Sequence, residues 1–79
     1  MARNGDAAAS IEHFQMAVQA APGWVDAWIN LSGELAEAGH FAEARSAVEM
    51  ALRLDPANAQ ARKLSDQLAR DPSAQQANP

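Results

Sequence analysis

The 79-residue sequence lacks cysteine and tyrosine and has few aromatic or basic residues. Without cysteine the chain can form neither a disulfide framework nor a thiolate centre. Its aromatic side chains are two phenylalanines and two tryptophans. Six lysines and arginines stand against ten acidic residues, which gives a net charge of −4. This balance argues against a general nucleic-acid binder, because binding to the phosphate backbone needs clustered basic residues.

The sequence also has no long apolar run. No stretch approaches the roughly 20 apolar residues that a membrane-spanning helix needs, so we expect no contact with a membrane. Residues 1–6 carry one arginine and no apolar core, which does not match a signal peptide. We therefore expect a cytoplasmic protein.

What the chain has in quantity is alanine, which makes up about a quarter of it. Alanine favours helices and their close packing. Residues 28–56 read WINLSGELAEAGHFAEARSAVEMALRLDP, with apolar residues three or four apart on either side of Gly39. Gly39 interrupts this pattern and Pro56 closes it. The segment therefore predicts two amphipathic helices joined at a glycine.

The pattern continues on both sides of this segment. A shift of 34 residues aligns five identical pairs: Gly5 with Gly39, Ala8 with Ala42, Met16 with Met50, Ala17 with Ala51, and Pro22 with Pro56. Together these signals predict four helices, at about 7–21, 24–38, 41–54 and 59–70. We expect Asp6 and Asn58 to cap the first and last helices, and Gly39 to end the second with a positive φ. Residues 1–5 are expected to be frayed and residues 71–79 to be a disordered tail.

Residues 28–56 resemble one tetratricopeptide repeat (TPR), a helix–turn–helix unit with the pattern W-x2-L-G-x2-Y…A-x3-F…P. Five residues match in order and spacing: Trp28, Leu31, Ala44, Ala51 and Pro56. Ser32, Leu35 and Val48 depart from the pattern but keep its small or apolar character. The shift of 34 residues equals the TPR period. The chain thus resembles about one and a half repeats plus a polar helix that caps the stack, with Arg62 where Trp28 would recur.

The resemblance implies an all-α fold in which four antiparallel helices stack with a right-handed superhelical sense. It also implies a concave groove that holds a peptide. Six residues are expected to face this groove: Asp26, Ile29, Asn30, Gly33, Glu37 and Gln67. Asn30 matches an asparagine that grips the peptide in some members of the family; alternatively, it bonds only within the helix packing. The acidic Asp26 and Glu37 disfavour an acidic C-terminal ligand, so a basic or apolar peptide fits better.

The resemblance further implies that the chain starts in mid-repeat, with a first helix whose pairing helix is missing. We expect Ile11, Phe14 and Val18 on this helix to stay partly exposed and to form a self-association surface. Either two chains pair as a homodimer and cover this patch, or neighbouring repeats of a longer array cover it.

No group of side chains has the spacing of a catalytic, cofactor or metal site. His13 and His40 lie far apart, whereas a metal site needs several ligands at defined spacing. Glu34 and Glu37 lie on one helix face with no pocket implied, which favours a solvated pair. The serines lack the sequence of a nucleophile elbow, and the isolated glycines form no phosphate-binding loop.

We therefore expect a non-enzymatic protein–protein interaction module of the TPR type that needs no cofactor. Its partners would be a peptide in the groove, a second copy of the chain, or both. The alternative is a TPR recruiting segment that is excised from, or acts beside, a larger enzyme such as a bacterial transferase or hydroxylase. This alternative rests on analogy alone, through the PGW-x3-W-x2-L sequence that begins at Pro22.

Overall fold

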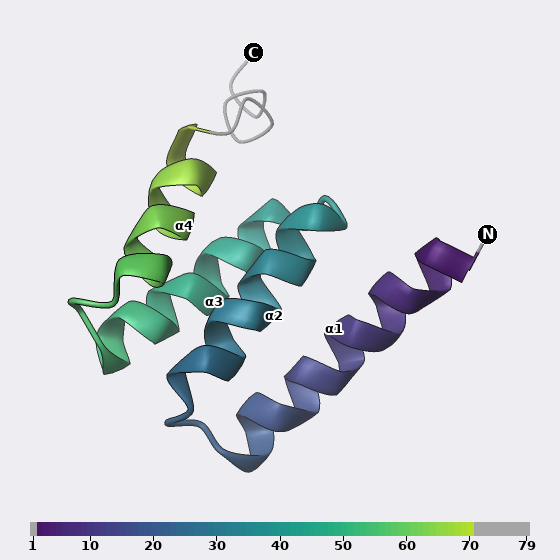
Figure 1. The fold of residues 1–79 in the computed structure, drawn as a ribbon, viewed down its shortest axis with the longest axis horizontal. Coiled ribbons are helices and arrows are strands. Elements are labelled where there is room, and N and C mark those ends of the chain that lie inside the picture. The colour runs from purple at the N-terminus through teal and green to yellow at the C-terminus, as the bar shows by residue number, and fades with distance from the viewer. Residues whose placement is uncertain (1, 71–79) are drawn as a thin grey trace.

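The computed structural model describes the backbone of residues 2–70 and the side chains of residues 8–70. This part of the chain forms four α-helices and contains no strand (Figure 1): α1 (Ala2–Ala20), α2 (Val25–Glu37), α3 (Phe41–Leu54) and α4 (Ala59–Arg70). The predicted all-α class is confirmed. The predicted disordered tail, residues 71–79, lies outside the described residues.

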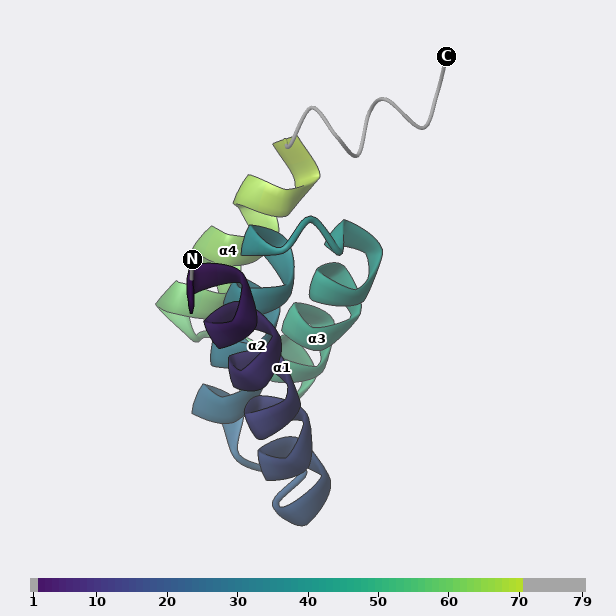
Figure 2. The same ribbon diagram turned by 90° about the vertical axis from the view of Figure 1, so that its right-hand side faces the viewer.

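α2 is the central helix, and it contacts each of the other three. α1 lies along one side of α2 and contacts no other described helix, whereas α4 packs on both α2 and α3. Figure 2 looks onto α1, with α2 behind it and α3 to the right. The right-handed superhelical sense stays a prediction of the resemblance.

The predicted bounds of α3 and α4 are confirmed, and α2 is one residue shorter at each end than expected. The prediction for the start of α1 is wrong: the helix begins at Ala2, so residues 2–5 are helical and Asp6 lies inside the helix. The physical reason is that Gly39 turns the chain between two helices, whereas no described helix precedes its counterpart Gly5. With nothing to turn away from, the alanine-rich segment continues as helix.

The core lies where α2 meets α3. Small side chains line this contact, and four of them on α3 are buried: Ala44, Ala47, Val48 and Ala51. From α2, Ser32 is fully buried, and its hydroxyl donates a hydrogen bond of 2.6 Å to the carbonyl oxygen of Ala44. A buried hydroxyl with a partner does not pay the desolvation cost of an unpaired one, so serine is compatible with this position. The expectation that Ser32 lies at a helix–helix contact is confirmed.

Two predicted helix ends are also confirmed. Gly39 has a φ of 87°, and the amides of Gly39 and His40 donate to the carbonyls of Ala36 and Leu35 at 3.0 and 2.8 Å. These two bonds form the Schellman motif that ends α2. At the start of α4, the side chain of Asn58 accepts a 2.9 Å bond from the amide of Ala61. Because both signals act over a few residues, they are readable from the sequence.

Alanine substitutions at two glycines should change stability in opposite directions. Gly39→Ala places a Cβ at a positive φ and should destabilise the fold by about 1–2 kcal/mol. Gly33→Ala is its control, since Gly33 lies inside α2 with no atom within 4 Å of the added Cβ. It should stabilise the fold by ~0.5–1 kcal/mol through helix propensity. Urea unfolding at one protein concentration measures both, and a shift of the same sign for both variants would contradict this description of the α2–α3 turn.

Candidate interaction surfaces

The described residues offer no metal site and no membrane span. No group of three or more histidine, aspartate and glutamate side chains within them could hold a metal ion. None of the four described helices is long and apolar enough to cross a bilayer. What the structure presents instead are two surfaces, one on α1 and one between α1, α2 and α3.

The first surface is the side of α1 that corresponds to the buried side of α3. We call it the α1 open face, and it consists of Ser10, His13, Phe14 and Ala17. Thirty-four residues later, their counterparts on α3 are Ala44 (0% exposed), Ala47 (4%), Val48 (1%) and Ala51 (0%). On α1 the same positions are not covered: His13 is exposed, and the other three are only partly buried. The two helices thus have equivalent sequences in different surroundings, because α3 has two neighbours and α1 has one.

The sequence prediction for this surface is partly right. Ile11 and Phe14 are partly exposed as expected, although both also pack against the core. The expected exposure of Val18 is wrong, because this side chain is only 6% exposed. Since α2 is the only described helix that α1 contacts, Val18 lies on the side of α1 that faces α2. The uncovered surface therefore lies around Phe14 and away from Val18.

Sequence reasoning missed Ser10, His13 and Ala17 as members of this surface. The signal was present: these residues stand 34 positions before residues that a TPR-like pattern buries. Two of the four side chains contact each other at the centre of the face. The rings of His13 and Phe14 are 5.8 Å apart between centroids and are inclined at 73°, an edge-to-face arrangement.

The six residues predicted to face a concave groove lie mainly at the surface. Four of them are exposed: Asp26, Asn30, Glu37 and Gln67. Ile29 and Gly33 are partly buried, and Ile29 packs against the core. The structure thus leaves four of the predicted side chains open to solvent, but none of the six lines the hollow found between the helices.

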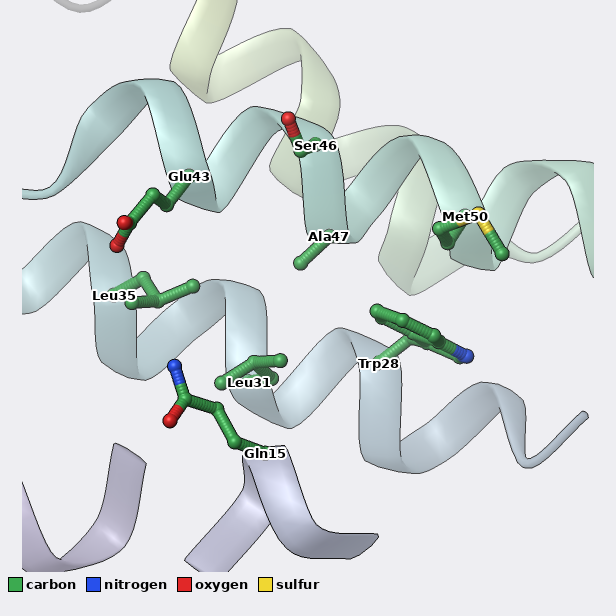
Figure 3. Close-up of a pocket in the computed structure, with 8 residues that line it drawn as sticks. All are labelled: Gln15, Trp28, Leu31, Leu35, Glu43, Ser46, Ala47 and Met50. Atoms are coloured by element: carbon green, nitrogen blue, oxygen red, sulfur yellow. The ribbon is translucent and has the colours of Figure 1, made fainter. Parts of the chain in front are cut away.

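That hollow, the second surface, lies on the other side of α2. It has a volume of about 410 Å³ and is lined by residues of three helices: Gln15 of α1, Trp28, Leu31 and Leu35 of α2, and Glu43, Ser46, Ala47 and Met50 of α3. It exists because α1 and α3 do not contact each other, although both pack on α2. Figure 3 shows Glu43 at the end of the hollow near Leu35, and Trp28 beside Met50 at the other end.

The floor of the hollow is apolar and its rim is polar. Leu31, Leu35 and Ala47 are buried, whereas Glu43 is exposed and is the only charged residue among those that line it. The indole of Trp28 donates a 2.8 Å hydrogen bond to the carbonyl oxygen of Pro22, in the turn between α1 and α2. This bond satisfies the polar atom of a partly buried tryptophan and fixes one end of the hollow.

A scan against protein-family models and searches of the curated proteins and of the solved structures found no match for this chain. Its function is therefore argued from the two surfaces and from the repeat in the sequence.

Proposed function

We propose that this chain is a non-enzymatic protein-interaction module of the TPR type that associates with itself through the α1 open face. One observation carries the proposal. α3 buries its Ala44–Ala47–Val48–Ala51 side, whereas α1 leaves the equivalent side, centred on Phe14, uncovered. A helix face that is buried in one copy of a repeat and open in the other is a place where a further helix fits.

The size of the chain supports the same proposal. A domain of 79 residues buries a modest core, so it gains stability when a partner covers more apolar surface. Full burial of a phenylalanine side chain contributes ~1.5–3 kcal/mol, and part of this remains to be gained at Phe14. Ser10 and Ala17 are small, so a second helix can approach the α1 backbone closely at both ends of the face.

Light scattering over a range of protein concentrations tests self-association. The wild-type mass should rise from that of a monomer to that of a dimer. Phe14→Glu and His13→Glu place a charge in the contact, and each should raise the dissociation constant at least about tenfold, or ~1.4 kcal/mol. Ala8→Glu is the matched control, because Ala8 is exposed and lies on the opposite side of the helix by the 3.6-residue repeat. It adds the same charge and should leave the constant unchanged.

Circular dichroism separates loss of contact from loss of fold. Phe14 packs against the core, so Phe14→Glu can also weaken the monomer. His13 is exposed, so His13→Glu should keep the helical signal of the wild type. A wild-type chain that stays monomeric at every concentration would overturn the proposal. So would a folded His13→Glu variant that dimerises as tightly as the wild type.

The hollow supports a second candidate function, the binding of a peptide that carries both apolar and basic side chains. Its buried floor of Leu31, Leu35 and Ala47 suits an apolar side chain, and Glu43 at the rim suits a basic one. The ligand class agrees with the basic or apolar peptide expected from the sequence. The place differs, since this site lies on the other side of α2 from the predicted groove residues Asp26, Asn30 and Glu37.

A fluorescence titration tests this candidate with a short synthetic peptide that contains leucine and arginine. A Trp24→Phe background leaves Trp28, which lines the hollow, as the single tryptophan reporter. Glu43→Lys should weaken binding by about tenfold, the effect of losing ~1.4 kcal/mol at a charge pair. Glu49→Lys, the control, makes the same charge change at an exposed residue of α3 outside the hollow. Equal weakening by both variants, or no change in Trp28 emission, would contradict a site in the hollow.

A further inference from the structure

The partner of the α1 open face can be inferred by asking which helix could cover it. On α3 the equivalent face packs against α2, which contributes four residues to the contact: Trp28, Leu31, Ser32 and Leu35. The helix of this chain that corresponds to α2 is α4, 34 residues later. If copies of the chain stacked head to tail, α4 of one copy would therefore cover the α1 open face of the next.

α4 does not have the surface for this task. Its residues at the four equivalent positions are Arg62, Ser65, Asp66 and Ala69. Arg62, Asp66 and Ala69 are exposed, and Asp66 forms a 2.8 Å salt bridge with Arg70 at the surface. Covering the α1 open face with this side of α4 would remove charged groups from water without a partner for each of them, which costs free energy. Head-to-tail stacking is thus blocked at α4.

α1 itself meets the requirement better. Between Ala8 and Ala20 its sequence contains one formally charged residue, Glu12, whereas α4 contains four: Arg62, Lys63, Asp66 and Arg70. The chain as a whole is acidic, so two copies repel each other over most of their surface. Pairing through α1 brings together the helix stretch with the lowest density of charge.

The α1 open face is also complementary to itself. Along the helix it reads small, ring, ring, small, from Ser10 through His13 and Phe14 to Ala17. In an antiparallel pair of helices with a twofold axis between residues 13 and 14, Ser10 lies opposite Ala17 of the second copy. His13 then lies opposite Phe14 of the second copy. The small residues allow close approach at both ends, and the rings meet in the middle, which is the arrangement that an isologous contact requires.

We propose that two copies of this chain form a closed dimer in which the α1 helices pack antiparallel about a twofold axis, and that α4 prevents growth beyond it. This inference rests on the self-association proposed above and specifies its geometry. It assigns different roles to the two ends of the stack: α1 forms the contact, and the polar α4 ends the assembly.

Disulfide trapping tests the geometry, because the wild-type chain contains no cysteine. Chains with Ser10→Cys and chains with Ala17→Cys, distinguished by a mass tag, are mixed and oxidised at a concentration where the wild type is dimeric. The antiparallel pair should give the mixed Ser10–Ala17 disulfide severalfold in excess of either homotypic disulfide. His13→Cys alone should give a homotypic dimer, since it lies beside the axis.

Head-to-tail stacking makes the opposite prediction. A mixture of His13→Cys and Ala69→Cys chains would then form mixed disulfides, and the scattering mass would grow past that of a dimer as the concentration rises. That result would overturn the twofold dimer but leave self-association standing. A wild-type mass that never exceeds the monomer would instead overturn the self-association on which the inference rests, so the two failures are distinguishable.

Discussion

The contact between Ser32 and Ala44 holds together the pair of helices on which the others pack. Ser32 is fully buried, and its hydroxyl bonds to the Ala44 carbonyl across the α2–α3 contact. A larger side chain at either position would push the helices apart, because the interior has no free volume to accept it. With α2 held against α3, α2 offers its remaining sides to α1 and α4. The hollow and the α1 open face are both consequences of that arrangement.

The repeat in the sequence creates three different surroundings for similar helices. α3 lies between two helices and buries an entire side of small residues. α1 carries a related sequence but has α2 as its single described neighbour, so Phe14 and His13 reach solvent. α4 follows α2 in the repeat but has charged residues where α2 has Trp28 and Ser32. In such quasi-one-dimensional stacks the ends carry the information about assembly, because the interior contacts are alike.

The sequence predicted well those features that depend on a few neighbouring residues. The turn at Gly39 and the cap at Asn58 are local, and the structure has both. The start of α1 was predicted incorrectly because the signal at Gly5 was borrowed from Gly39, whose turn exists only where another helix precedes it. The exposure of Val18 was predicted incorrectly for a related reason: the sequence shows that a neighbour is missing, but not which side of the helix is left open.

The hollow was beyond the reach of pattern reasoning. Gln15 and Glu43 belong to helices that do not contact each other, and only the packing of both on α2 brings them to one site. The resemblance to a TPR directed attention to the other side of α2, toward Asn30. A surface that depends on how far two helices stay apart is a property of the packing, and no spacing in the sequence records it.

The central claim is that α1 has an open face which only a second copy covers, and amide hydrogen exchange at several protein concentrations tests it most directly. Exchange reports local opening, which is easier for a helix with few packed contacts. The account predicts that protection between Ala8 and Ala20 rises with concentration while protection in α4 stays constant. Protection of α1 that equals that of α3 in dilute solution and does not change with concentration would contradict it.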